Sequence, residues 1–266
     1  MWGVADYLGG LQSRKRQVLA VVVISQLAGL AVIALVVAGL GVAFPGVENM
    51  LPAALAGAMG AFCIVIFYLA LSYGPISIVA PVLAASACIP VIYGLVTGER
   101  PSGLQLTGLA LTLTGVILVS IVHDSANHAR GRRGIGFAVI AAVLLGSLLV
   151  VFSRASAVDP YWAPLVLRVF SLATVAIFAL VRRVSVRVER RGVLVIALIG
   201  ILDMVANLAY SVATTLQLLA IVAVLSSLFP VVTVALARFH LGERVTRLQG
   251  AGSVLTIAGV LLVAAG

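Results

Sequence analysis

Three ionisable side chains stand inside apolar segments of the sequence, where a charge is energetically costly: Asp6, Arg168 and Asp203. Within a membrane such groups are rare, and each is a candidate for substrate binding or proton transfer. Asn207 follows Asp203 by four residues, so the two share one face of a helix. Arg168 either snorkels to the interface or pairs with Asp203 and holds it charged. An unpaired Asp203 would be able to carry a proton, which makes protons a candidate coupling ion.

The polar face that begins at Asp203 continues through Tyr210, Ser211 and Thr214. A polar stripe in an apolar helix cannot face lipid, so it lines a cavity or packs on polar partners as an interhelical hydrogen bond. The matching positions of the first half are apolar or small, which favours a ligand over a symmetric structural contact. Other candidate wall residues are Gln26 and Tyr68, although a tyrosine serves equally as an interface anchor.

Proline interrupts two apolar segments, at Pro81 and Pro90 in one and at Pro230 in the other. Proline removes a helix hydrogen bond and kinks the chain, so these residues are candidate hinges, with kinks that serve packing alone as the alternative. No Walker loop, serine-nucleophile elbow or zinc-binding His-Glu-x-x-His motif occurs. We therefore expect no enzyme activity, no cofactor and no metal.

The amino-acid composition indicates the class of protein that holds these residues in place. Of 266 residues, 63% are hydrophobic and only 9% are charged, whereas a soluble domain has about 25% charged residues. The mean hydropathy is +1.25. These values exclude a water-soluble enzyme, a disulfide scaffold and a disordered chain. The net charge of +9 lies in loops without interleaved aromatic residues, so we expect no nucleic-acid partner.

Apolar runs of about 20 residues, the length that spans a bilayer, divide the chain into helices. Met1–Gly10 is too short for a full span, and we interpret it as the second half of a first, truncated helix. The nine full spans that we expect are 17–41, 52–73, 75–97, 103–122, 135–155, 162–181, 193–214, 216–239 and 248–265. The sequence thus predicts an all-α polytopic membrane protein with a bundle of ten helices.

The basic residues set the expected orientation. Counting the half-span as the first helix, the odd-numbered loops hold 14 of the 17 Lys and Arg residues, and the even-numbered loops hold 2. Positive residues accumulate on the cytoplasmic side. We therefore expect a multi-pass protein of the inner (cytoplasmic) membrane with both termini outside.

The chain also repeats itself. Residues 98–120 and 242–264 share 12 identities in 23 positions, including Gly-Glu-Arg and Leu-Gln in register. Five helices per copy is an odd number, so the second copy enters the membrane upside down. We expect inverted five-helix repeats at 1–122 and 135–266, with a site between them.

Trp2-Gly3, the doubled Gly-Glu-Arg turn and the Gly-x-x-Leu-x-x-x-Gly-Val run after each turn resemble the EamA branch of the drug/metabolite transporter superfamily. The resemblance covers essentially the whole chain. It implies a secondary transporter that moves a small metabolite or amphipathic compound, often outward. A lipid-linked sugar flippase is the second reading, and a membrane scaffold or passive channel is the third. The lipid bilayer and the small-molecule substrate are the expected partners. Whether the chain also forms a homodimer is left open.

Overall fold

The computed structural model describes residues 1–74, 79, 82–83, 85–120, 128–181, 183, 188–226, 228–241 and 246–265. Every regular element in these residues is a helix. The helices are α1 (Trp2–Lys15), α2 (Val18–Leu40), α3 (Val47–Tyr73), the 3-10 helix η1 (Ala85–Ala87), α5 (Cys88–Val96), α6 (Gly103–Ser120), α7 (His128–Ser156), α8 (Trp162–Val181), α9 (Arg190–Leu216), α10 (Leu219–Ser226), α11 (Phe229–Leu241) and α12 (Arg247–Ala265).

Local sequence signals mark several helix ends. Gly41 ends α2 in a left-handed conformation (φ 63°), which glycine adopts without a steric penalty. Asp159 lies in the turn before α8 and caps the start of this helix, because its Oδ1 accepts the backbone N–H groups of Tyr161 and Trp162 at 2.8 and 2.7 Å. Ser102 and Gln105 form a reciprocal capping box at the start of α6, with side chain to backbone distances of 3.1 and 2.8 Å.

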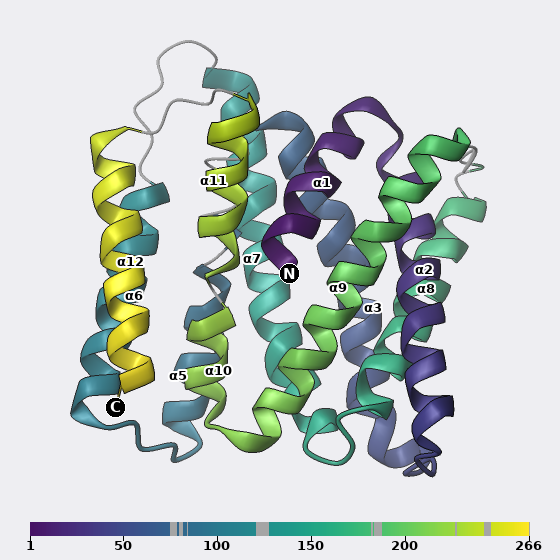
Figure 1. Cartoon of the computed structure of the whole chain (residues 1–266), viewed down its shortest axis with the longest axis horizontal. Coiled ribbons are helices and arrows are strands. Elements are labelled where there is room, and N and C mark those ends of the chain that lie inside the picture. The colour runs from purple at the N-terminus through teal and green to yellow at the C-terminus, as the bar shows by residue number, and fades with distance from the viewer. Residues whose placement is uncertain are drawn as a thin grey trace.

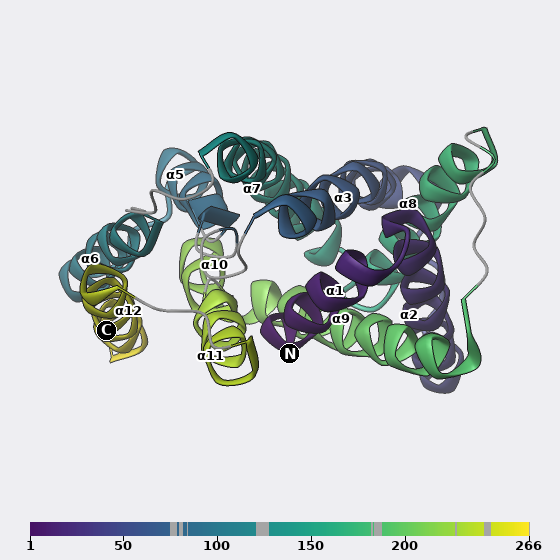
Figure 2. The same cartoon turned by 90° about the horizontal axis from the view of Figure 1, so that it is seen from above.

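The helices run side by side in two rows (Figures 1 and 2). α5, α7 and α3 form one row, and α10 with α11, α1, α9 and α2 form the other. The chain alternates direction along the bundle, and α1 begins halfway along its length (Figure 1). α10 and α11 lie end to end as one interrupted span. Counted with this pair and with η1–α5 as single spans, the described residues contain ten helical spans.

Many large apolar side chains on the outside of the bundle are exposed, as expected of surfaces that face lipid. Leu35 is 73% exposed, Leu180 77% and Phe239 83%. Among the described residues, five helical segments are long and apolar enough to cross a membrane: α2, α3, α8, Arg133–Ser156 of α7 and Gly192–Leu216 of α9. The all-helical membrane fold is therefore confirmed, while the two-repeat division remains a prediction.

Two expected spans differ in the structure. The span 216–239 is broken between Ser226 and Phe229, because Pro230 at the second position of α11 has no N–H to continue the ladder of α10. The expected half-span Met1–Gly10 extends to Lys15, so Arg14 and Lys15 form the last turn of α1. Arg14 donates hydrogen bonds to the Leu71 and Gly74 carbonyls at 3.3 and 3.2 Å, which ties this end of α1 to the end of α3.

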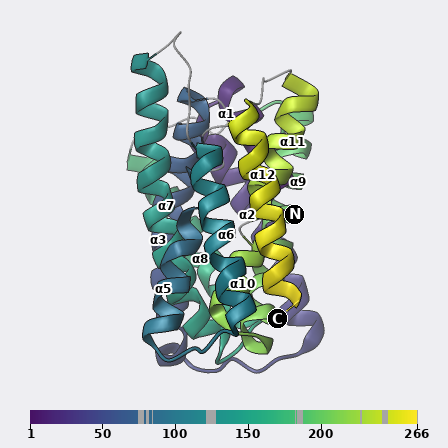
Figure 3. The same ribbon diagram turned by 90° about the vertical axis from the view of Figure 1, so that its left-hand side faces the viewer.

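α6 and α12 pack closely at one end of the molecule and run in opposite directions (Figures 1 and 3). Their backbones meet at glycines: a Cβ on Gly108 would lie 2.5 Å from the Gly259 carbonyl, and one on Gly259 would lie 2.6 Å from the Gly108 carbonyl. Gly115 approaches the Gly252 carbonyl in the same way, at 2.6 Å. The seven-residue glycine spacing of each helix thus provides the smooth face that this contact requires.

Replacing Gly259 with alanine will destabilise this helix pair by about 1–3 kcal/mol, because the new methyl meets backbone atoms that cannot yield. Gly250→Ala on the same helix is the matched control, since a Cβ there meets nothing within 4 Å. It should be neutral or stabilising by up to about 1 kcal/mol. Thermal unfolding in detergent measures both, and equal midpoints would contradict the packing described.

Candidate functional site

A cavity lies inside the bundle, where α1, α2, α3, α7, α8 and α9 meet the breaks at η1 and between α10 and α11. The space open to the centres of water-sized molecules is about 110 Å³, which is room for several waters or a small ligand. Its wall is mostly apolar, with Phe67, Leu145 and Leu167 among the lining side chains. A mostly apolar wall with a few polar groups is typical of small-molecule sites.

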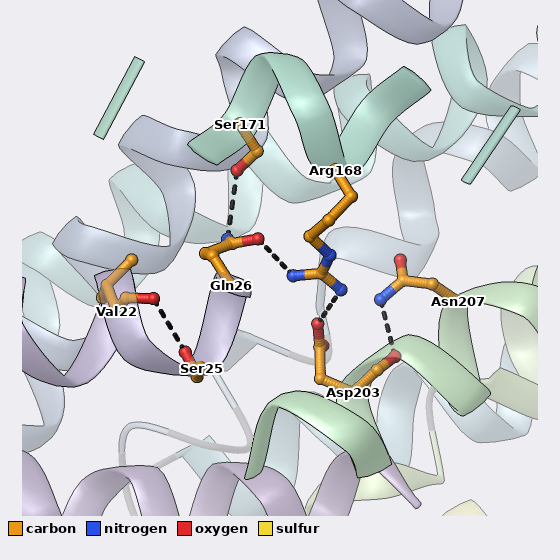
Figure 4. Close-up of polar contacts among 7 residues, drawn as sticks. All are labelled: Val22, Ser25, Gln26, Arg168, Ser171, Asp203 and Asn207. Atoms are coloured by element: carbon orange, nitrogen blue, oxygen red, sulfur yellow. Dashed lines mark hydrogen bonds and ion pairs between the residues drawn. The ribbon is translucent and has the colours of Figure 1, made fainter. Parts of the chain in front are cut away.

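The polar groups of the cavity form one connected chain of side chains (Figure 4). Arg168 Nη2 donates to Asp203 Oδ2 at 2.5 Å, and Nη1 donates to Gln26 Oε1. Gln26 Nε2 donates in turn to Ser171 Oγ at 3.1 Å, which fixes the orientation of the amide. We call Ser171, Gln26, Arg168 and Asp203 the polar cluster. Three helices, α2, α8 and α9, therefore converge on one guanidinium.

Burial differs strongly across the ion pair. The Arg168 side chain is 4% exposed, whereas the Asp203 side chain is 26% exposed and lines the cavity. An arginine this deeply buried is tolerated only when its N–H groups are paired. Two of them are, and Nε has no hydrogen-bond partner among the described residues. Arg168 thus acts as a buried support, and Asp203 presents its carboxylate to the cavity.

The buried face of α8 and a glycine of α2 make room for the Arg168 guanidinium. Leu167, Arg168, Ser171 and Val175 lie on the buried face of α8, at helical spacing. On α2, a Cβ at Gly29 would lie 3.3 Å from both Nε and Cζ of Arg168 and 2.9 Å from a carbonyl of α9. A glycine at this position gives the guanidinium its space between the two helices.

Two further predicted residues reach the cavity. Asn207 lies one turn beyond Asp203 and lines the cavity. Its side-chain Nδ2 donates to the backbone carbonyl of Asp203 at 2.7 Å, so its amide oxygen is available to another donor (Figure 4). Asp6 lines the cavity from α1, together with Trp2. Within the described part of the chain, the Asp6 carboxylate has no hydrogen bond or ion pair. No group of three or more metal-ligating side chains occurs among the described residues.

Residues 132–265, half of the chain, match the model of the EamA-like transporter family. The chain belongs to this family. It is therefore a multi-pass membrane protein of the drug/metabolite transporter superfamily, whose EamA-like members are transporters and typically not enzymes. The resemblance stated above from Trp2-Gly3 and the doubled Gly-Glu-Arg turn is confirmed.

Solved structures show the same fold. One of them, titled only as the crystal structure of a protein, is 17% identical and superposes with a TM-score of 0.74 over 99% of this chain and 98% of that one. In all, 27 chains of solved structures match. At such identity the likeness concerns the fold alone. No curated protein matches this EamA-like chain.

The structure decides between the two alternatives for Arg168 in this EamA-like protein. The side chain does not snorkel, since it is buried and paired with Asp203. The expectation that an unpaired Asp203 carries a proton therefore loses its premise. The carboxylate without a partner in the cavity wall is Asp6.

Three other predicted site residues lie outside the polar cluster. Tyr210 is buried between Trp2 and Phe152, with ring centroids 5.9 and 6.1 Å away. Ser211 donates to Ser156 Oγ at 2.8 Å and to the Pro160 carbonyl at 2.9 Å, so it joins α9 to α7 and the following turn. Tyr68 packs on Gly9 of α1 and on the ring of Phe67. None of the three is among the described residues that line the cavity, so a part for them in substrate binding remains a prediction.

The candidate hinges fall beside the cavity or outside the described residues. Pro81 lies outside them. Pro90 is buried in the first turn of α5, directly after η1, and Pro230 is the second residue of α11. Each proline deprives the residue four positions earlier of its helix hydrogen bond, and those residues are Ser86 and Ser226. Both serines line the cavity.

Our sequence analysis missed Ser86, Ser226 and Ser171. The signal for the first two was present, because Ser-x-x-x-Pro occurs at 86–90 and again at 226–230. Ser171 lies three residues after Arg168, on the same helical face. Each is a small polar residue whose importance appears only when a second helix is placed beside it.

Glu99 caps a helix of the other half of the chain. Its carboxylate accepts the backbone N–H groups of Leu219 and Ala220, at the start of α10, at 2.9 and 3.1 Å. Gly94 makes room for this carboxylate. The first Gly-Glu-Arg turn is thus fastened to the first turn of the broken span α10–α11, where a negative charge is favoured. The second turn, at 242–244, lies outside the described residues.

Proposed function

We propose that this protein is a secondary active transporter that exports a small metabolite or amphipathic compound across the cytoplasmic membrane by alternating access. The observation that carries the proposal is the polar cluster at the wall of an otherwise apolar cavity. A buried ion pair in a membrane bundle is energetically expensive and is a weak source of stability. A binding site explains its presence better than structural support does.

Symmetry supports alternating access. In the 144-residue repeat, Gly108 corresponds to Gly252 and Gly115 to Gly259. The repeat therefore converts the contact of Gly108 with Gly259 into the contact of Gly252 with Gly115, and both contacts are present between α6 and α12. Thr112 and Thr256 correspond in the same way, and each donates to the glycine carbonyl four residues earlier at 2.8 Å. Two antiparallel, equivalent helices in contact are what an inverted repeat about a two-fold axis produces.

The helix breaks support a moving site. η1–α5 and α10–α11 are both interrupted where they meet the cavity, and both interruptions precede a proline, Pro90 or Pro230. Discontinuous helices in corresponding positions of two halves frame the substrate sites of inverted-repeat transporters. We assign these prolines to the hinges about which the cavity opens to either side.

A comparison of metabolites tests the proposal. Medium from cells that express the chain is compared with medium from cells that express Asp203→Asn at the same membrane level. We expect at least one small compound to accumulate outside only with the unaltered chain. Uptake of that compound into liposomes that contain the purified protein should saturate and should respond to an imposed gradient.

Each alternative has its own result. Flux that rises linearly with concentration indicates a channel. An accumulated lipid-linked sugar indicates a flippase, and no difference in any compound, together with no flux in liposomes, indicates a scaffold. Any of these results would replace the exporter proposal.

A further inference from the structure

The charges that line the cavity do not balance. Among the described lining residues the charged side chains are Asp6, Arg168 and Asp203. Asp203 is compensated by Arg168 at 2.5 Å. Asp6 has no hydrogen bond or ion pair in the described part of the chain, so the cavity wall carries one excess negative charge when both carboxylates are ionised.

The groups that face Asp6 do not remove this excess. Asp203 on α9 repels the Asp6 carboxylate more strongly than the amino group of Met1 attracts it. From α3, Cys63 lines the cavity and Tyr68 lies near enough to feel the charge of both carboxylates, and neither side chain supplies a positive charge. Arg168 on α8 is already paired, and Gln26 on α2 is neutral.

Two further titratable groups lie against α1 among the described residues: Glu189, which pairs with Arg16 just after the end of α1, and His240 of α11. The His240 ring lies 5.9 Å from the ring of Tyr7, the neighbour of Asp6. Tyr7 and Asp6 are adjacent in the helix and so point in different directions. His240 therefore approaches α1 beside Asp6 rather than at its carboxylate.

An uncompensated carboxylate in a mostly apolar cavity is unfavourable, and it is neutralised by a proton or by a cation. The two cannot neutralise it together. We propose, building on the transport function above, that the cavity exchanges one proton on Asp6 for one small organic monocation. An organic monocation here means an amine or quaternary ammonium on an apolar body.

The wall fits such a ligand. The rings of Trp2, Phe67 and Phe229 line the same cavity as the two carboxylates, and Trp2 and Phe229 meet edge to face with centroids 6.3 Å apart. Aromatic faces attract organic cations and also accommodate an apolar body. An anion would have to compete with Asp203 for Arg168, and a zwitterion would leave the excess charge in place.

The exchange conserves charge. When the cavity faces one side, the cation enters and the Asp6 proton leaves to water on that side. When it faces the other side, the cation leaves and a proton returns to Asp6. Each cycle moves one cation against one proton, so an inward proton gradient drives cation export.

Proton release on binding tests the exchange directly. Benzyltrimethylammonium, whose charge is permanent, is added to the purified protein in weakly buffered detergent solution while pH and bound cation are recorded. We expect one proton released per cation bound, and an affinity that rises up to about tenfold per pH unit while Asp6 stays protonated in the free protein. Phenylacetate should release none.

Variants assign the proton to a residue. Asp6→Asn should abolish proton release, Asp6→Glu should restore it, and Glu48→Gln, an exposed residue at the start of α3, should leave it unchanged. Cation binding without proton release, or undiminished release from Asp6→Asn, would overturn the assignment. Failure to bind the cation would overturn the substrate class.

The outcomes separate this inference from the transport function. Saturable, gradient-driven flux of a neutral or zwitterionic compound without proton release would overturn the exchange and leave the transporter standing. Proton release on cation binding with no flux across liposomes would support the exchange site and contradict transport.

Discussion

Replacing Arg168 with leucine will reduce transport roughly 10- to 100-fold, because Asp203 loses the ion-pair partner that positions its carboxylate at the cavity. The same change will destabilise the protein by about 2–4 kcal/mol, since a partly buried carboxylate is left uncompensated and Gln26 loses its donor. Arg168→Lys should retain part of the activity, because an ammonium cannot reproduce the geometry that serves Gln26 and Asp203 together.

A double replacement distinguishes function from support. Arg168→Leu with Asp203→Leu removes both charges, so it should recover most of the lost stability and none of the transport. Detergent unfolding midpoints and liposome flux are measured on all three variants. Recovery of transport in the double variant would show that the ion pair is structural glue.

Loss of the Glu99 cap will open the bundle at the end where α5 finishes and α10 begins. Glu99→Ala removes two charge-assisted hydrogen bonds to Leu219 and Ala220, worth about 2 kcal/mol together at this partly exposed position. If these hydrogen bonds must break when the cavity opens at that end of the bundle, their loss raises the fraction of molecules open at that end roughly thirtyfold. Labelling of a cysteine in the cavity from that side measures the population.

The control for this prediction is Glu48→Gln, which changes another acidic residue in the first turn of a helix. Its labelling rate should equal that of the unaltered chain. If Glu99→Ala does not change the labelling rate, the prediction is wrong. The first Gly-Glu-Arg turn would then stay attached to α10 throughout the transport cycle.

The spans were predictable because hydropathy over 20 residues reflects the bilayer thickness, and α2, α3 and α8 agree closely with the expected ranges. The break between Ser226 and Phe229 was hidden, because both sides of it are apolar. Pro230 was a signal of the break, although hydropathy cannot show that the chain turns there.

Asp203 and Asn207 were found as cavity residues because charge and amide groups rarely occur in a span. Tyr210 shares their helical face but lies seven residues beyond Asp203, about 10 Å along the helix axis, where its ring packs between Phe152 and Trp2 instead of lining the cavity. The helical periodicity of a sequence shows which residues share a face of a helix. It does not show how far along that face a cavity extends. The pairing of Arg168 with Asp203 was one of two open alternatives, and only the position of α8 against α9 decides it.

The most direct measurement of alternating access uses a single cysteine at Asn207 in a chain whose Cys63 and Cys88 are alanine. A membrane-impermeant thiol reagent is applied to right-side-out and to inside-out vesicles, with Leu198→Cys, exposed on the outer face of α9, as the control that should react from neither side. We expect the cysteine at 207 to react from both sides and substrate to protect it. Reaction from one side only, or from neither, would contradict a cavity that opens alternately across the membrane.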